Sequence, residues 1–158
     1  EAIAHRLFKM LGPQLAQAGV TIYADQVSFG LLRTIYPRAL LHRASPAHYG
    51  KEFLSLSLSV KVVKGWQEGM RHIQQYTSKH SESIITTNTK IANKFQQLID
   101  AAVVYVNTSI AFTDGYEFGL GGEIGISTQK LHARGPMALQ ELTTYKWLVR
   151  SQGAIRQT

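Results

Sequence analysis

Polar residues and glycines gather in one stretch of this sequence, and they are its best candidates for chemistry. Asn107, Ser109 and Asp114 follow the apolar run "AAVVYVN" (101–107), and the glycine-rich run "EFGLGGEIG" (117–125) comes next. Ligands of parallel α/β proteins bind at the carboxyl ends of the strands, so these side chains predict a substrate-binding loop. The alternative is a polar turn whose side chains satisfy its own backbone.

The glycine-rich run does not fit a dinucleotide-binding fingerprint. That fingerprint needs G-x-G-x-x-G directly after a strand and at the start of a helix. Gly119 and Gly121 have the first spacing, but position 124 is isoleucine and the third glycine comes one place late, at Gly125. Two interpretations stay open: glycines that let the backbone pack closely at positive φ, or a loop that closes over a substrate carried by another part of an enzyme.

Other catalytic or metal-binding patterns are weak. The sequence has no cysteine, which excludes disulfides, thiolate metal sites and a cysteine nucleophile within these residues. Its six histidines show neither H-x-x-x-H spacing nor a carboxylate at ligand spacing, so we expect surface or structural roles for them and no metal site. No G-x-S-x-G nucleophile elbow occurs.

The middle of the chain, which must position the polar stretch, alternates between strand and helix patterns. Apolar alternation predicts a strand over 52–63, and the continuous apolar run predicts a buried central strand over 101–107. The patterns predict, in order, strand 52–63, a helix of about 10 residues from Trp66, strand 83–87, helix 91–99 with Thr87 or Asn88 near its N-cap, and strand 101–107. This order predicts two βαβ crossovers and an α/β fold: a mainly parallel sheet with flanking helices.

The two ends of the chain are patterned differently. A helical stripe predicts a helix over 2–18 that Pro13 would kink or split, and a strand follows at 20–24. We expect mostly loop with at most a short helix over 25–50, a turn at 132–136 and a short helix at 137–142. The segment "TYKWLVR" (144–150) alternates again, which predicts an isolated strand. Such a strand needs a sheet to join, and we favour a partner subunit over the edge of its own sheet.

Composition suits a soluble globular protein of one domain's length. The chain has 158 residues, 44% hydrophobic and 17% charged, with a net charge of +7. The charge raises the possibility of nucleic-acid binding, but the basic residues are spread along the whole chain with no RNA-binding signature, so we expect none. No apolar run approaches the ~20 residues of a membrane span, and no signal peptide is recognisable, so we expect a cytoplasmic protein that binds no membrane.

Beyond these patterns, one long stretch resembles a known family. The run "NTSIAFTDGYEFGLGGEIGISTQKLHARGPMALQELTTYKWLVRSQGAIR" is similar to the C-terminal signature of the gamma-glutamyl phosphate reductases. These glutamate-5-semialdehyde dehydrogenases of proline biosynthesis belong to the aldehyde dehydrogenase superfamily. The family pattern runs close to N-A-S-T-R-F-T-D-G, then F-G-F-G-A-E-I-G-I-S-T, then H-A-R-G-P. Upstream, "YGKEFLSLSLSVKVV" and "SKHSESIIT" resemble the same family.

The resemblance implies a division of the chain and a missing part. Residues 1–142 resemble the C-terminal portion of the catalytic domain, and 143–158 an oligomerisation strand and tail that would form a homo-oligomer through 144–150. Family members begin with a Rossmann domain and carry a catalytic cysteine just before the helix with which this sequence begins. The sequence also lacks an initiator methionine. We therefore expect part of an enzyme, inactive alone, with no catalytic residue in this chain.

The resemblance also implies site residues. The family reduces gamma-glutamyl phosphate with NADPH through a thioester on the cysteine, so NADP is the implied cofactor. Glu52, with Leu54 beside it, takes the place of the glutamate that contacts the nicotinamide-side ribose, although an exposed glutamate at a strand start is the alternative. Asn107, Ser109, Asp114 and Gly115 match the substrate-side loop, and so do Phe118, Gly119, Gly121 and Glu123.

One departure from the family pattern affects the expected function. The T-R of N-A-S-T-R-F is Ile110-Ala111 here, and an arginine would be a natural partner for a phosphorylated, carboxylated substrate. Two hypotheses therefore stand beside the enzyme: a truncated, inactive paralogue that acts as an interaction module, and a basic nucleic-acid binder supported only by the net charge.

Overall fold

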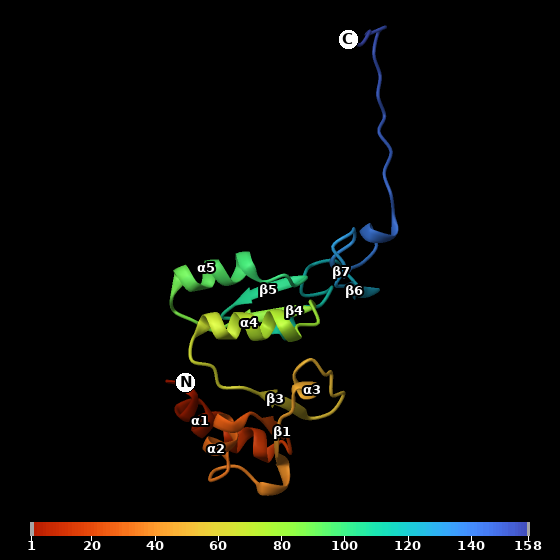
Figure 1. Ribbon diagram of the computed structural model, residues 1–158. Coiled ribbons are helices and arrows are strands. Elements are labelled where there is room, and N and C mark those ends of the chain that lie inside the picture. The colour runs from red at the N-terminus through yellow and green to blue at the C-terminus, as the bar shows by residue number, and fades with distance from the viewer. Residues whose placement is uncertain (1, 158) are drawn as a thin grey trace.

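A computed structural model describes residues 2–157 as two small parallel sheets, a hairpin and an extended C-terminal segment (Figure 1). The sheet of strands β2-β1-β3 lies at one end, β4 and β5 lie between it and the β6–β7 hairpin, and residues 144–157 point away from the rest. The helices are α1 (Ala4–Gln17), α2 (Gln26–Leu32), α3 (Pro46–Tyr49), α4 (Trp66–Tyr76) and α5 (Thr89–Leu98), with 3-10 turns η1 (Arg38–Leu40), η2 (Ile110–Phe112) and η3 (Gln140–Leu142). The strands are β1 (Thr21–Ala24), β2 (Leu41–Arg43), β3 (Ser57–Val60), β4 (Ser81–Ile84), β5 (Val103–Val106), β6 (Gly125–Ser127) and β7 (Gly135–Met137).

The first sheet is built around β1, which pairs in parallel with β2 and β3. Strand alternation turns Ile22 and Ala24 to one face, where each is 1% exposed. That face packs against α1 and α2, and the apolar stripe expected over 2–18 supplies part of the contact. The predicted strand at 20–24 is confirmed, and α1 runs through Pro13 as one helix instead of splitting.

Asp25 joins α2 to the first sheet. Its carboxylate caps the helix by accepting from the backbone N–H groups of Val27 and Ser28, and it also accepts from the backbone of Val62, just past β3, at 3.2 Å. Burial opposes the ionised form, but these hydrogen bonds, with that from the Ser28 hydroxyl, outweigh it and lower the pKa of Asp25.

The second sheet consists of β4 and β5, paired in parallel and connected through α5. Alternation turns Ile84 and Val104 toward α4 and α5, where they pack against Met70 and Phe95. The helices predicted from Trp66 and over 91–99 are confirmed, and the Asn88 side chain caps α5 by accepting from Ile91 N at 3.1 Å. β4 begins two residues before the strand predicted at 83–87.

The prediction of two βαβ crossovers within one sheet is wrong for the first crossover. β4-α5-β5 is a parallel crossover, but β3 pairs with β1 and lies in a different sheet from β4. β3 is also shorter than the strand predicted over 52–63. Leu54, at φ 52°, and Leu56 are mainly exposed, so they do not extend the buried face of Leu58 and Val60.

Three further segments differ from the sequence prediction. Residues 25–50, expected to be mostly loop with at most a short helix, contain α2, η1, β2 and α3. The expected turn at 132–136 overlaps β7, which pairs with β6 in an antiparallel hairpin, and the helix expected at 137–142 is only the 3-10 turn η3. Residues 144–150 form no strand, because among residues 2–157 they have no neighbouring strand with which to pair.

Candidate functional site

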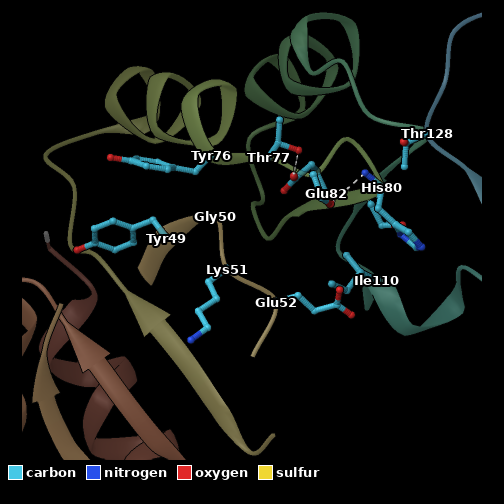
Figure 2. Close-up of a pocket in the computed structure, with 12 residues that line it drawn as sticks. Tyr49, Gly50, Lys51, Glu52, Tyr76, Thr77, His80, Glu82, Ile110 and Thr128 are labelled. Carbon is cyan, nitrogen blue, oxygen red and sulfur yellow. Dashed lines mark hydrogen bonds between the residues drawn. The ribbon is translucent and has the colours of Figure 1, made fainter. Parts of the chain in front are cut away.

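A pocket of about 520 Å³ lies between the α3 segment, the end of α4, the start of β4 and η2 (Figure 2). Its wall is formed mainly by residues with aromatic, hydroxyl or charged side chains. The lining residues are Tyr49, Gly50, Lys51, Glu52, Tyr76, Thr77, Ser78, His80, Ser81, Glu82, Ile110 and Thr128. A mixed wall of this kind suits a ligand with both a ring and several hydroxyl or carbonyl groups.

One wall of the pocket carries Glu52, the residue for which a cofactor contact is expected. Its side chain is exposed, and among residues 2–157 its carboxylate forms no hydrogen bond or ion pair. In Figure 2 the Glu52 side chain lies beside Ile110. Tyr49 and Tyr76 line another part of the pocket with ring centroids 5.4 Å apart, and burial followed by the charge of Asp25 raises the pKa of Tyr49. An unpaired carboxylate in a pocket wall is chemically apt to accept hydrogen bonds from ligand hydroxyls.

The segment that presents Glu52 is held from the polar face of the first sheet. Tyr23, on β1, stacks on Phe53 at 5.2 Å and on His48 at 4.3 Å between ring centroids. Backbone Ser45 N donates to His48 Nδ1 at 2.8 Å, which closes a capping box around α3. Two aromatic stacks and a cap therefore fix residues 45–53 over the sheet.

The opposite wall is formed by the end of α4 and the start of β4. The Thr77 hydroxyl donates to the Glu82 carboxylate and accepts from Lys79 N at 2.9 Å. Figure 2 shows Thr77 and Glu82 together on this side, with His80 near Ile110 and Thr128. Glu82 is thus a second carboxylate in the wall, already engaged by a neighbouring hydroxyl.

The polar residues expected to bind substrate are engaged with nearby backbone. Asn107 sits at φ 56°, and its side chain donates to Thr86 O at 2.9 Å while accepting from Thr86 N at 2.8 Å. Ser109 Oγ accepts from Ala111 N at 3.2 Å, and Asp114 Oδ1 accepts from Tyr116 N at 2.8 Å. These contacts support the alternative that the sequence left open, a polar turn that satisfies its own backbone. The side-chain oxygens still have lone pairs that these contacts do not use.

The glycine-rich loop needs glycine for two separate reasons. A Cβ on Gly115 would lie 2.2 Å from the carbonyl oxygen of Gly122, so the backbone segments approach too closely for any side chain. Gly119 and Gly121 each adopt φ of 72°, the left-handed region. The loop closes on itself, because Gly115 N donates to the Glu123 carboxylate at 2.9 Å. This geometry supports the open interpretation of close packing at positive φ.

The structure does not bring the residues expected to bind substrate into the pocket that Glu52 lines. Ile110, next to Ser109, reaches the pocket that Glu52 lines. Gly119 instead lines a separate pocket of about 420 Å³ with residues 138–141 and 143. Leu54 is 88% exposed and Phe118 is 45% exposed, and neither lies in the wall of the first pocket.

Sequence reasoning missed the hydroxyl-bearing wall of the pocket. Thr77, His80, Ser81 and Glu82 all line it, yet the histidines were expected to have only surface or structural roles. A signal was available: Ser81 and Ser83 alternate with Glu82 and Ile84, so one face of β4 is polar. That face meets Thr113 and Thr108, since Ser81 Oγ lies 2.7 Å from Thr113 Oγ1 and Ser83 Oγ donates to Thr108 O at 2.7 Å.

The described residues offer neither a metal-binding cluster nor a membrane-spanning helix. Within residues 2–157, no group of three or more metal-ligating side chains is placed to hold a metal ion. None of the helices in the same range has the length and apolar character needed to cross a membrane.

Comparisons with known proteins agree on one enzyme. No family model matches the chain. It is 57% identical to the gamma-glutamyl phosphate reductase of Chlorobium limicola over 142 residues, which covers 90% of this chain and 34% of that protein. The gamma-glutamyl phosphate reductase of Bacteroides thetaiotaomicron is 52% identical over 143 residues, with 90% and 34% covered. The chain therefore spans about a third of the length of the curated relatives that it matches.

Solved structures of gamma-glutamyl phosphate reductase also match the chain. The crystal structure of gamma-glutamyl phosphate reductase from Thermotoga maritima matches with a TM-score of 0.91 and 41% identity, over 99% of this chain and 36% of that one. The corresponding enzyme from Saccharomyces cerevisiae matches with a TM-score of 0.53 and 27% identity, over 73% and 28%. The chain is homologous to this part of gamma-glutamyl phosphate reductase, and its α/β fold is the aldehyde dehydrogenase-like fold of that segment.

Proposed function

We propose that this chain forms part of an NADPH-dependent reductase that converts gamma-glutamyl phosphate to glutamate-5-semialdehyde in proline biosynthesis. The observation that carries the proposal is the 57% identity over 90% of the chain. Within that enzyme the chain supplies one wall of the cofactor site and a substrate-side loop. The nucleophilic cysteine that this chemistry needs is not among these 158 residues.

On the cofactor side, the proposal assigns binding to Glu52. Its exposed carboxylate stands in the wall of a pocket of about 520 Å³ and is available to accept from the ribose hydroxyls of the nicotinamide half of NADP. Leu54, two residues on and 88% exposed, offers apolar surface beside it. When bound, the cofactor supplies the hydride, and the residues of this chain orient it.

On the substrate side, the proposal assigns binding to the loop after β5. The local hydrogen bonds do not use every lone pair on the side-chain oxygens of Asn107, Ser109 and Asp114. These oxygens can therefore accept hydrogen bonds from N–H or O–H groups of a ligand. The turn of Gly115, Gly119 and Gly121 shapes the loop, Glu123 closes it, and exposed Phe118 adds an apolar surface.

Assembly and location complete the proposal. Residues 144–150 would pair as a strand with a second copy, because Tyr145, Trp147 and Val149 are at least 80% exposed. The proposed enzyme is a cytoplasmic homo-oligomer that uses small-molecule substrates and binds neither nucleic acid nor membranes.

A second candidate function is an inactive paralogue that acts as an interaction module. The replacement of the family's arginine by Ala111 favours it, because position 111, next to the pocket residue Ile110, then carries a methyl group instead of an anion partner. The exposed apolar segment 144–150 would serve this function equally well.

A chimaera separates the two functions. The 142 matched residues of this chain replace the corresponding segment of the Chlorobium limicola reductase, and phosphate-dependent reduction of NADP by glutamate-5-semialdehyde is measured. The enzyme proposal expects an active chimaera and no activity from the 158-residue chain alone. An inactive but folded chimaera that recovers activity with Ile110→Thr and Ala111→Arg would establish the inactive paralogue.

The cofactor assignment has its own test in the active chimaera. Glu52→Gln should raise KM for NADP about tenfold, since one charge-assisted hydrogen bond is worth about 1.5 kcal/mol, and leave KM for the aldehyde unchanged. Glu117→Gln is the matched control, because Glu117 is exposed and does not line this pocket. An equal rise of both KM values in Glu52→Gln would contradict the assignment.

A further inference from the structure

A chain of hydroxyl groups crosses the polar face of the second sheet and ends at a pocket histidine. The Tyr105 hydroxyl lies 3.0 Å from Thr113 Oγ1, which lies 2.7 Å from Ser81 Oγ, which lies 2.7 Å from His80 Nδ1. We call Tyr105, Thr113, Ser81 and His80 the hydroxyl chain. It joins β5, the loop after η2 and β4, and its last two members line the pocket.

The direction of these hydrogen bonds follows from counting donors. If Tyr105 donates to Thr113, Thr113 to Ser81 and Ser81 to His80, every hydroxyl hydrogen in the chain is used. In the reverse direction, the Tyr105 hydrogen has no acceptor among residues 2–157. Phenol is also the most acidic of the three hydroxyls and therefore the best donor.

The forward direction determines the protonation of the histidine ring. Nδ1 must accept, so the neutral ring carries its hydrogen on Nε2. Within residues 2–157 Nε2 has no hydrogen-bond partner, and His80 lies in the pocket wall on the same side as Ile110 and Thr128 (Figure 2). The ring thus has one donor left for a ligand.

The charges of the pocket indicate what that donor would bind. Lys51 contributes one positive charge, and Glu52 and Glu82 contribute one negative charge each, so the wall carries net negative charge with His80 neutral. Negative charge disfavours an oxyanion and leaves an uncharged oxygen acceptor as the better partner. A carboxamide or acyl carbonyl oxygen is such an acceptor.

We propose that the hydroxyl chain holds His80 as the Nε2–H tautomer, so that the ring donates a hydrogen bond to an uncharged carbonyl oxygen of a ligand in the pocket. His80 is then a binding residue, while Thr113 and Tyr105 act through it as positioning residues. The proposal rests on the proposed function only for the source of the carbonyl: the nicotinamide carboxamide of a cofactor or the γ-carbonyl of a glutamyl group.

Long-range proton–nitrogen NMR spectra of the chain labelled with ¹⁵N-histidine test the tautomer. In the wild type we expect protonated Nε2 and unprotonated Nδ1 at His80. Thr113→Val cuts the hydroxyl chain and should give a mixture of tautomers, whereas Thr113→Ser restores a hydroxyl and should retain Nε2–H. Ser83→Ala is the matched control, because Ser83 shares the face of β4 but bonds Thr108 O instead. Protonated Nδ1 in the wild type would overturn the proposal, and so would a Thr113→Val spectrum identical to it.

Titration of the same labelled protein tests the ligand. Nicotinamide and glutamine are the two probes, and a shift of the His80 ring signals with one of them identifies the source of the carbonyl. Thr113→Val should weaken that binding in proportion to the fraction of Nε2–H tautomer that it retains, which is about twofold for an equal mixture of tautomers. A response to neither probe, or to inorganic phosphate alone, would overturn the carbonyl assignment. None of these measurements requires hydride transfer, so their failure is distinct from failure of the reductase proposal.

Discussion

The two parallel sheets of this molecule use their faces in different ways. In the first, β1 buries Ile22 and Ala24 almost completely under α1 and α2, and its other face stacks aromatic rings. In the second, every residue of β4 and β5 is only half-buried, and the face away from the helices carries hydroxyl groups bonded to the following loop.

The difference separates stability from positioning. Apolar burial is nondirectional and scales with area, so the first sheet contributes chiefly to the free energy of folding. Hydrogen bonds contribute less net free energy but fix geometry, so the second sheet contributes chiefly to the placement of residues 107–125. Each sheet should therefore respond to a different kind of substitution.

The largest expected effect would come from the first sheet. Ile22→Ala should lower the free energy of unfolding by about 3 kcal/mol, because it leaves a cavity in a closed core. Val104→Ala, the half-buried counterpart on β5, should cost only about 1 kcal/mol. Urea denaturation of the two variants measures both values. Equal losses would show that the two sheets do not differ as their burial indicates.

A loop glycine should give the next largest effect. Gly115→Ala places a Cβ against the carbonyl oxygen of Gly122, so we expect a loss of about 2 kcal/mol and a displaced loop. Gly122→Ala is the control, since nothing lies within 4 Å of a Cβ at that position. Amide exchange over 114–125 should accelerate in the first variant and stay unchanged in the second. Unchanged exchange in both would contradict the close approach.

A smaller effect is expected where the hairpin joins the second sheet. Asp100, between α5 and β5, accepts from Lys130 at 2.9 Å and from Arg134 at 2.8 Å, and these hydrogen bonds lower its pKa to about 2. A lowered folded-state pKa gives stability that is present above the ordinary value of 3.8 and is lost as pH falls toward about 2.

Amide protection of residues 127–135 should therefore fall between about pH 4 and pH 2 in the wild type. Asp100→Asn should show low protection at pH 5 already and no further step on acidification. Since the carboxylate is partly exposed, 1 M salt at pH 6 should reproduce part of the loss. A step that persists in Asp100→Asn would assign the acid transition to another group.

Local patterns predicted those elements whose signals lie within a few residues. The stripe of α5 and its Asn88 cap are visible in the sequence, because helix periodicity and capping are local properties. The resemblance of residues 107–156 to one enzyme family is also carried by a continuous stretch of sequence, and the comparisons confirm it.

Patterns that depend on tertiary pairing were harder to predict. The alternation over 52–63 looks like one strand, but only Ser57–Val60 find a partner, and Leu54 turns away at positive φ. That β3 pairs with β1 and not β4 follows from long-range packing that periodicity does not encode. The hydroxyl chain was missed for the same reason: Thr113 and Ser81 are 32 residues apart.

The smallest expected effect on stability, and the clearest break with both sheets, is in the C-terminal segment. Trp147 is 84% exposed, and the centroids of the Trp147 and Tyr145 rings lie 5.8 Å apart. Residues two apart in an extended chain point to the same side, which explains this contact. Trp147→Ala should change the free energy of unfolding by less than about 0.5 kcal/mol, because little surface is buried.

If residues 144–150 pair with a second copy, the same substitution should weaken self-association, which sedimentation velocity across a concentration series measures. Lys146→Ala, one residue away on the opposite side of the segment, should leave association intact. A wild-type chain that remains monomeric at every concentration would remove the strand-pairing proposal, and an equal loss in both variants would show that the segment associates without strand register.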